Sequence, residues 1–275
     1  MQNDNGTANE ELIVIKRPSA FTPSLKMKNQ ILLIVLAFLA PLNSIQAAPE
    51  KGSTAEKKKQ DWSFTPNPEL PNVLILGDSI SIGYTLQVRE LLKDKANVYR
   101  PVAANGKKPI NCSDTISGLR KLDSWLANHE WTVIHFNWGL HDLKHVKKAG
   151  KQINSSDPAD PQLTTPDQYA RNIESIVTKL KATGAKLVFA TTTPVTPGTT
   201  NPLRSAEAPQ AYNAAALKIM KANKIRVNDL YSFSKPHLKE WQLPKNVHFK
   251  RAGSAALAEQ VASVLTEELA AAKNE

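Results

Sequence analysis

Two segments far apart in the chain carry the side chains best suited to covalent chemistry. Gly77-Asp78-Ser79 follows a short apolar run and leads into a helical stretch, with Ser81 close behind. A serine at such a turn exposes its hydroxyl beside the free amides of the helix start, which suits a nucleophile, although it would equally suit a helix cap. Near the C-terminus, Asn246-Val247-His248-Phe249 precedes the last helical stretch. A histidine on such a loop can fold back over the serine and act as its general base.

A third segment, Gly139-Leu140-His141-Asp142, follows another apolar run and is continued by Lys144 and His145. Two histidines four residues apart with an acid beside the first are similar to the His-Glu-x-x-His pattern of zinc proteases. However, the segment directly follows a predicted strand, contains a lysine and lacks an evident third ligand. We therefore predict no metal site and no cofactor. Inactivation by a chelator would favour a metallohydrolase, and inactivation by a serine-directed phosphonate would favour Ser79.

Short apolar runs alternate with stretches of helical period from Asn72 onward, and this alternation predicts the elements that position these side chains. The predicted strands are Val73–Leu76, Val98–Val102, Thr132–Phe136, Leu187–Thr191 and Ile225–Leu230. The predicted helices are Ile82–Lys93, Thr115–Asn128, Pro166–Thr183, Pro209–Asn223 and Gly253–Ala272. Five such repeats predict an α/β fold, a three-layer α/β/α sandwich with a five-stranded parallel sheet.

Functional groups of parallel sheets gather at the carboxyl ends of the strands. The three segments all follow predicted strands or lie where a loop can reach the same edge. Two long connections, His141–Thr165 and Thr193–Pro209, should lie over that edge as well. Because the first carries four lysines and the second carries Arg204, they predict a partly basic wall around a pocket.

The combination of these segments resembles the SGNH, or GDSL-type, hydrolases over about Asn72–Ala271, which implies a flavodoxin-like SGNH hydrolase fold. The resemblance implies that Ser79 is the nucleophile and His248 the base. It also implies three donors to the oxyanion: the amide of Ser79, the amide of Ser113 in Asn111-Cys112-Ser113-Asp114-Thr115, and His141. Ser113 stands where the family has glycine, with Gly106 as an alternative amide donor, and His141 stands where the family has asparagine.

The family's fourth block is Asp-x-x-His, and here Lys245 occupies the position of the acid. Asn246, a backbone carbonyl or a carboxylate from elsewhere such as Asp229 would then hold the ring of His248, or the enzyme would work as a Ser–His dyad. Loss of an orienting acid can cost as much as about 10⁴ in turnover. A weak or inactive glycan-binding protein on the same scaffold is therefore one alternative function.

Several other residues are assigned supporting or packing roles. Asp78, Gly139, Asp142 and Asn246 are expected to support the site, and Asp114 to order its loop. Cys112 is the only cysteine, which excludes an internal disulfide; we predict that it is buried. Trp125 is predicted to pack in the core, whereas Trp138 is a candidate for either packing or substrate contact.

The N-terminal part of the chain predicts export. Residues 1–26 are interpreted as an extension before a translation start at Met27. Residues 27–48 have the basic flank, short apolar run and small residues of a secretory signal peptide. The apolar run, Ile31–Ala40, is too short to span a bilayer, so no stable membrane insertion is expected after cleavage. Residues 49–71 are predicted to be a flexible leader to a hydrolase domain at 72–275, with a periplasmic or secreted location.

The composition narrows the partners. With 35 Lys and Arg against 25 Asp and Glu the formal net charge is +10, which favours acidic polymers or is simply a solvated basic surface. No aromatic and basic interleaving typical of nucleic-acid binding is present. We expect an exported serine esterase acting on a small-molecule or polysaccharide ester, most specifically a carbohydrate acetyl esterase. A lipase or lysophospholipase is a further alternative, and the sequence does not indicate the oligomeric state.

Overall fold

The computed structural model describes residues 62–127 and 129–274. Five strands form one parallel sheet in the order β2-β1-β3-β4-β5. The strands are β1 Asn72–Leu76, β2 Asn97–Tyr99, β3 Val133–Phe136, β4 Lys186–Ala190 and β5 Arg226–Asn228. The predicted α/β class and the five-stranded parallel sheet are thus confirmed. The strands are short, and most of their apolar side chains are buried because helices cover both faces.

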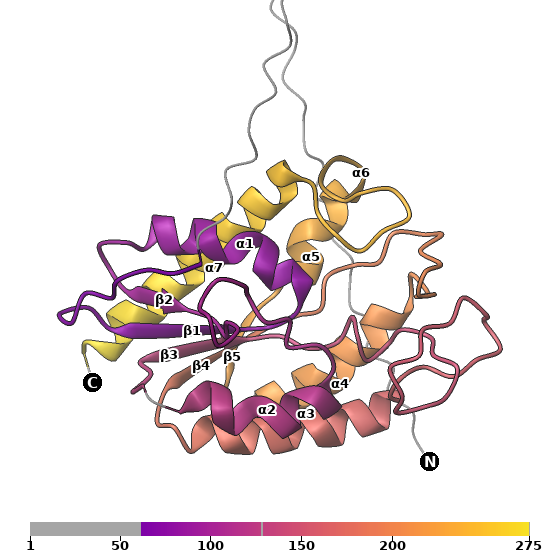
Figure 1. Ribbon diagram of the computed structural model, residues 1–275, viewed down its shortest axis with the longest axis horizontal. Coiled ribbons are helices and arrows are strands. Elements are labelled where there is room, and N and C mark those ends of the chain that lie inside the picture. The colour runs from indigo at the N-terminus through magenta and orange to yellow at the C-terminus, as the bar shows by residue number, and fades with distance from the viewer. Residues whose placement is uncertain (1–61, 128, 275) are drawn as a thin grey trace, which may run out of the picture. The chain divides into compact units, whose positions relative to one another are not determined.

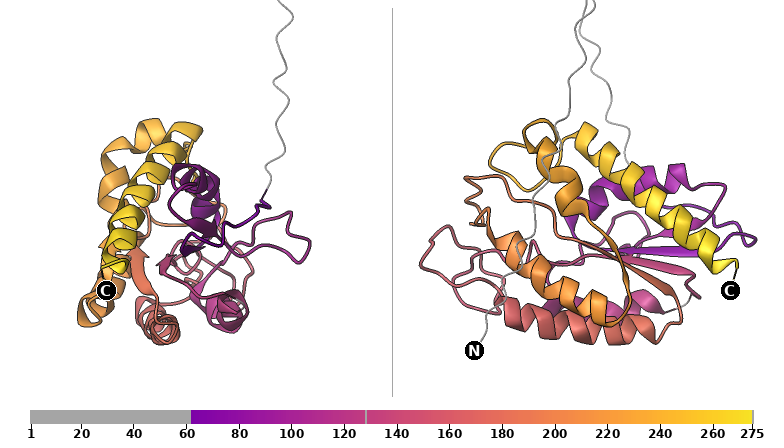
Figure 2. Two further views of the ribbon diagram at one scale, coloured as in Figure 1. Left: turned by 90° about the vertical axis from the view of Figure 1, so that its left-hand side faces the viewer. Right: turned by 180° about the vertical axis from the view of Figure 1, so that it is seen from behind.

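Helices flank the sheet on both sides, as Figure 1 and the turned views of Figure 2 show. One layer contains α1 and α7, which pack on each other, and the other contains α2, α3 and α4. The helices are α1 Ser79–Leu91, α2 Thr115–Leu126, α3 Pro166–Lys181, α4 Ala208–Ala222, α5 Leu230–Ser234, α6 Leu238–Trp241 and α7 Arg251–Ala272, with a 3₁₀ turn at Lys235–His237.

Helix α1 begins at Ser79, three residues before the predicted start at Ile82. The cause is local: Asp78 is the N-cap, and its carboxylate accepts a hydrogen bond from the amide of Ile80 at 2.9 Å. The candidate nucleophile therefore lies in the first turn of the helix, directly after β1. Its backbone N–H has no acceptor within the helix, because the first amides of any α-helix lack one.

The stretch between β5 and α7 departs most from the prediction. The predicted strand Ile225–Leu230 is shorter, because the carboxylate of Asp229 accepts from the amide of Ser232 at 3.1 Å and starts α5. Two short helices and a 3₁₀ turn then extend to Trp241. They carry the chain to the loop that contains His248.

The folded domain begins earlier than the predicted boundary at Asn72. Trp62 is 4% exposed, and its carbonyl accepts from the guanidinium of Arg89. Phe64 packs edge-on against Tyr99 with ring centroids 4.9 Å apart. The segment from Trp62 to Pro71, predicted as the end of a flexible leader, is therefore packed on the edge strand β2. The predicted extension, signal peptide and remainder of the leader lie outside the described residues.

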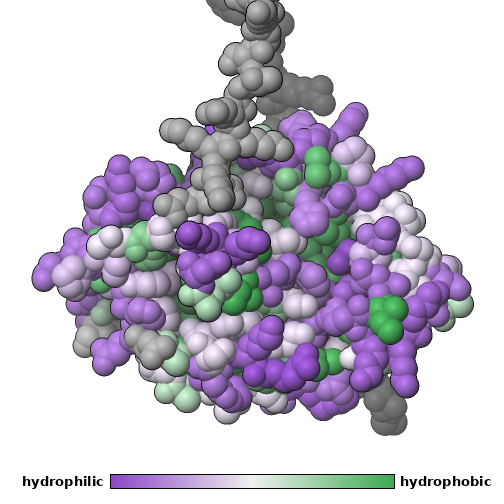
Figure 3. Space-filling view, viewed as in Figure 1, coloured by the Kyte–Doolittle hydropathy of each residue, from purple (hydrophilic) through white to green (hydrophobic). Residues whose placement is uncertain are grey.

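Within the described residues, no helix is long and apolar enough to cross a membrane. The face of the molecule seen in Figure 3 is mostly hydrophilic, with hydrophobic residues in small patches between the polar ones. Such scattered apolar surface is usual for a folded domain and does not mark an interaction site.

Candidate active site

The fold brings Ser79 and His248 together from opposite ends of the domain. The Oγ atom of Ser79 lies 2.9 Å from Nε2 of His248, a hydrogen-bond distance. Ser79 starts α1 after β1, and His248 lies on the loop before α7, which packs against α1. The predicted serine–histidine pair is therefore in contact, with geometry suitable for proton transfer.

Asn246 fixes the orientation of the His248 ring. Its Oδ1 lies 2.7 Å from Nδ1 of the ring and 3.0 Å from the backbone nitrogen of His248. Because a backbone N–H can only donate, the atom facing it must be the amide oxygen. That oxygen then accepts from Nδ1–H, which leaves the lone pair on Nε2 to accept the proton of Ser79.

Lys245, at the position of the family's acid, adopts a left-handed conformation with φ +52°. Both Lys245 and Asn246 line the pocket beside His248. Of the candidates that the sequence left open for holding the ring, the structure selects Asn246. Asp229 instead caps α5 and accepts from Thr191. The ring thus has a neutral amide partner, which sets the tautomer but supplies no negative charge to an imidazolium.

A buried arginine that the sequence analysis did not select holds the nucleophile turn. Arg100, only 4% exposed, donates to the carbonyls of Gly77 and Ile110 at 3.1 and 2.9 Å. It also donates to the hydroxyls of Ser81 and Thr85. Burial lowers the pKa of Arg100. The sequence did contain a signal for this role: Arg100 lies inside the predicted strand Val98–Val102. A charge buried in a strand needs polar partners, so it indicates a specific set of contacts.

Ser113 is predicted to donate its amide to the oxyanion. It adopts a positive φ of 59°, the conformation expected where the family has glycine. However, its N–H donates to Oδ1 of Asn111 at 2.8 Å, and Asn111 rather than Ser113 lines the pocket. The Asn111 side chain closes a local turn that occupies this amide. In this structure the amide of Ser113 therefore donates within its own turn, and its donation to the oxyanion stays a prediction.

His141 lines the pocket together with Ser79 and His248. Its Nδ1 is buried without a hydrogen-bond partner among the described residues, which leaves Nε2 as the nitrogen that can reach a ligand. Burial is the main cause that lowers the pKa of His141. The charges of Arg204 and Lys144 lower this pKa further, and the charge of Asp78 raises it. The lowered pKa favours the neutral ring, whose one N–H can donate to an oxygen in the pocket.

Asp142 and Gly139 hold His141 in place. Buried Asp142 accepts from the amide of Thr115 at the start of α2, from the Thr115 hydroxyl and from the Thr164 hydroxyl. Gly139 has φ +154°, and a Cβ there would collide with the Thr192 hydroxyl. Burial raises the pKa of Asp142 to about 7, against the hydrogen bonds from Thr115. Both residues order the loop and neither lines the pocket.

These residues surround a pocket of about 320 Å³. Ten of its residues are polar, and the apolar ones are Leu140, Pro202 and Val247; the polar ones are Asp78, Ser79, Asn111, His141, Thr199, Asn201, Arg204, Lys245, Asn246 and His248. The loop predicted to form a partly basic wall does contribute Arg204. Most of the lining residues are thus polar, although carbon atoms contribute as much of the pocket surface as polar atoms do.

Trp138 and Cys112 are packing residues. Trp138 is fully buried beside Gly118, and its Nε1 donates to the carbonyl of Cys112 at 3.3 Å. Of the two roles considered for Trp138, the structure selects packing. Cys112 is fully buried, as predicted, and burial raises the pKa of its thiol to about 11, so a nucleophilic thiolate is not favoured there.

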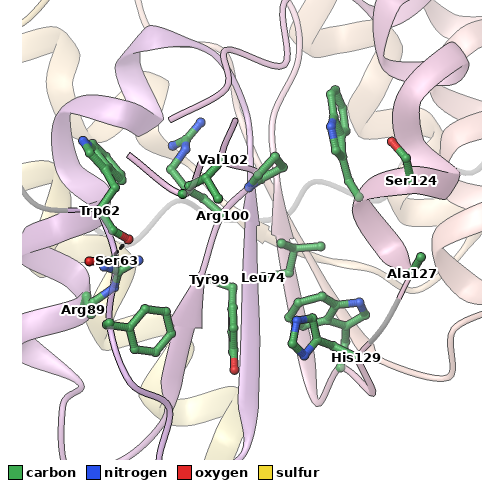
Figure 4. Close-up of a pocket in the computed structure, with 15 residues that line it drawn as sticks. Trp62, Ser63, Leu74, Arg89, Tyr99, Arg100, Val102, Ser124, Ala127 and His129 are labelled. Atoms are coloured by element: carbon green, nitrogen blue, oxygen red, sulfur yellow. Dashed lines mark hydrogen bonds between the residues drawn. The ribbon is translucent and has the colours of Figure 1, made fainter. Parts of the chain in front are cut away.

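A second pocket, of about 360 Å³, lies beside β2. Gly106, the alternative to Ser113, lines this pocket and not the one that contains Ser79 and His248. Figure 4 shows Tyr99 between Arg89 and His129 in this pocket, and Trp125, predicted as core, is half-buried in its wall.

Among the described residues, no three His, Cys, Asp or Glu side chains form a cluster that could hold a metal ion. His145, the second histidine of the pattern that is similar to zinc proteases, instead hydrogen-bonds through Nδ1 to the carbonyl of Asp160 at 2.7 Å.

Comparison with solved structures finds the same fold in several hydrolases. An acetyl xylan esterase, AlAXEase, is 16% identical with a TM-score of 0.54, covering 70% of this chain and 99% of that protein. A lipase/acylhydrolase from Enterococcus faecalis is 18% identical with a TM-score of 0.55, covering 71% and 95%. A putative acylhydrolase from Bacteroides fragilis is 18% identical with a TM-score of 0.54, covering 75% and 91%.

A comparison with curated protein sequences found no match. The family model described as GDSL-like Lipase/Acylhydrolase matches residues 75–256, a range that includes the nucleophile turn, the His141 loop and His248. It agrees with the fold and with the family resemblance of the sequence. The chain therefore belongs to the GDSL-like lipase/acylhydrolase family of ester-hydrolysing enzymes.

Proposed function

We propose that the protein is an exported serine esterase that removes short acyl groups, in particular acetyl groups, from carbohydrates. The observation that carries the proposal is the chain of contacts from Ser79 Oγ to His248 Nε2 and from His248 Nδ1 to Asn246 Oδ1, at 2.9 and 2.7 Å. It gives the serine a base in the correct tautomer. An inactive binding scaffold would have no need for that arrangement.

The mechanism is acyl transfer in two steps. Nε2 of His248 takes the proton of the Ser79 hydroxyl while Oγ attacks the ester carbonyl carbon, and the carbonyl oxygen becomes an oxyanion. The N–H of Ser79 and the ring N–H of neutral His141 donate to it. The imidazolium then protonates the leaving alcohol as the C–O bond breaks, which forms the acyl-enzyme. Water attacks the acyl-enzyme by the same route and releases the acid.

Asn246 has a limited part in this mechanism. It keeps Nδ1–H engaged, so Nε2 is always the atom that faces Ser79. It does not offset the positive charge that His248 gains in the transition state, as a carboxylate would. We therefore expect a working enzyme that is slower than one with an acid at this position.

The nature of the pocket supports a short acyl group and a polar alcohol. Ten of its thirteen lining residues have hydroxyl, amide, imidazole or charged side chains. With three apolar residues and a volume of about 320 Å³, the pocket offers limited apolar contact to a long acyl chain. A sugar presents hydroxyl groups that such walls can bind. Among the solved structures of the same fold, AlAXEase is described as an acetyl xylan esterase. Export is supported by the signal-like sequence of residues 27–48.

The test is hydrolysis of p-nitrophenyl acetate, butyrate and octanoate by the purified protein, followed by release of acetate from acetylated glycans. We expect the rate to be highest for acetate and to fall with chain length. The variants Ser79→Ala and His248→Ala should both lose the activity. Labelling with a serine-directed phosphonate, located by mass spectrometry, should modify Ser79.

Each contrary outcome has a distinct meaning. A preference for octanoate would overturn the carbohydrate assignment and favour a lipase or lysophospholipase. No hydrolysis of any ester, with a folded protein, would favour the glycan-binding alternative. Activity that survives in Ser79→Ala would overturn the acyl-enzyme mechanism.

A further inference from the structure

Positive charge gathers at one wall of the active-site pocket. Arg204 and Lys245 line it, and Lys144 lies close enough to Arg204 for each charge to disfavour the other. The acid among the lining residues is Asp78. It is 2% exposed, and its carboxylate already accepts from the amide of Ile80 as the cap of α1. The pocket therefore presents more cationic than anionic groups to a ligand.

Arg204 is the unusual member of this wall. Its side chain is buried, 7% exposed, and Nε donates to the carbonyl of Leu140 at 2.7 Å. None of the ion pairs formed among the described residues includes it. Burial lowers its pKa to about 10, opposed only by the charge of Asp78. Buried arginines are almost always paired with an anion, because an unpaired buried charge is costly.

The guanidinium still has donors to offer. With Nε on Leu140, the two terminal nitrogens of Arg204 have no hydrogen bond to a described residue. They form the flat fork that binds a carboxylate or another oxyanion through two parallel hydrogen bonds. Because Arg204 lines the same pocket as Ser79 and His248, an anion bound by that fork would lie beside the reacting ester.

The loop that carries Arg204, between β4 and α4, is held in position by its backbone and does not depend on the guanidinium. The amide of Arg204 donates to the carbonyl of Thr199 at 3.1 Å, and the amide and carbonyl of Leu203 pair with Ser155 and His145. These backbone bonds hold Arg204 in place without its charge. A purely structural role would therefore require only the single bond to Leu140.

We propose that Arg204 binds an oxyanion of the substrate, a carboxylate or a sulfate, next to the ester, so that the enzyme acts on an acylated acidic glycan. This inference rests on the proposed esterase function. Arg204 is in this view a specificity-determining residue, and Lys245 at the exposed rim of the pocket adds to the attraction. A neutral acetylated glycan would leave the buried guanidinium unpaired.

The first experiment uses a matched pair of polymers: acetylated polygalacturonate with free carboxylates, and the same polymer with its carboxylates methyl-esterified. We expect wild-type kcat/KM to be about tenfold higher for the free acid, the scale of a charge-assisted pair. Arg204→Met should abolish this ratio. Arg120→Met, which removes the same charge from an exposed site on α2, should retain it.

p-Nitrophenyl acetate has no anionic group and reports the basal chemistry. Arg204→Met should lose more activity on the free-acid polymer than on this ester, because the ester has no anionic group for the guanidinium to bind. Any loss on the ester measures the bond from Arg204 to the carbonyl of Leu140, beside His141. Parallel losses on this ester and on both polymers would show a structural role and overturn the proposal. An unchanged preference for the free acid in Arg204→Met would overturn it as well.

Direct binding separates this inference from the proposed function. Calorimetry with trigalacturonate, a sulfated oligosaccharide and neutral xylotriose needs no turnover. We expect at least one anionic oligosaccharide to bind more tightly than xylotriose, and Arg204→Met to lose that difference. The two anionic ligands show whether carboxylate or sulfate is preferred. Equal affinity for all three overturns the inference even if esters are hydrolysed, whereas anion binding without hydrolysis overturns only the esterase function.

Discussion

The two halves of the reacting pair are held in very different ways. The turn that carries Ser79 is held by Arg100, which follows β2. Its guanidinium donates to the carbonyls of Gly77 and Ile110 and to the hydroxyls of Ser81 and Thr85. The loop that carries His248 is exposed, and Asn246, two residues away, orients the ring. The nucleophile thus depends on tertiary contacts, and the base depends on a local turn. We expect substitutions near Ser79 to affect folding and those near His248 to affect mainly the rate.

The largest effect is expected for Ser79→Ala, which removes the nucleophile itself but no contact of Arg100, and should lower kcat for p-nitrophenyl acetate by about 10⁴ or more. The change in the free energy of unfolding should be small. The matched control is Ser81→Ala, whose hydroxyl donates to the carbonyl of Asp78. It should retain activity within about tenfold. Loss of activity in Ser81→Ala alone would assign the nucleophile to Ser81.

Arg100→Met tests whether the nucleophile turn depends on the buried arginine. We expect it to lower the free energy of unfolding by about 3 kcal/mol, because the carbonyls of Gly77 and Ile110 lose their buried donor. Urea denaturation measures this, and kcat should fall as well. Arg120→Met on the surface should change stability by less than about 0.5 kcal/mol. Equal stability of the two variants would contradict the role assigned to Arg100.

Asn246→Asp tests the local arrangement at the base. A carboxylate in the same place would stabilise the imidazolium as well as the tautomer, so kcat should rise by about tenfold at neutral pH. Asn246→Leu removes the acceptor and should lower kcat below wild type. The pH dependence of kcat separates the two effects. A decrease in Asn246→Asp would show that the amide makes a contact that the carboxylate cannot.

Asp142 belongs to neither region, since it contacts Thr115 and Thr164, and it predicts a pH-dependent stability. Its pKa is about 7 in the folded protein, above the value of about 4 for an unfolded chain. The folded state therefore holds a proton that the unfolded state releases, and stability from this group falls as pH rises from about 4 to 7. The slope is at most about 1.4 kcal/mol per pH unit.

The measurement is urea denaturation of wild type and Asp142→Asn across that range. His135, whose pKa burial lowers to about 4, acts with the opposite sign, so only the difference between the two proteins isolates Asp142. We expect that difference to change steadily from pH 4 to 7. A constant difference would show that folding does not raise the pKa of Asp142.

Much of the fold was predictable because its signals are local. Alternating apolar runs and helical periods gave the five strands and five main helices within a few residues, and the buried strands and capped helices of the structure follow from them. The boundary at Asn72 was wrong because the contacts of Trp62 and Phe64 are with β2, far along the chain. The short helices after β5 were missed because they have too few residues for a periodic pattern.

The sequence by itself determined which residue types were available: a serine after the first strand, a histidine before the last helix, and a lysine in place of the acid. Only the tertiary structure decided that Asn246 holds the ring, that the Ser113 amide is taken by Asn111, and that Arg100 and Arg204 come to lie beside the nucleophile. The physical reason is that motifs encode short-range geometry. The partners of the buried Arg100 and Arg204 lie far from them in the sequence, and they come into contact only where strand ends and long loops meet in the folded chain.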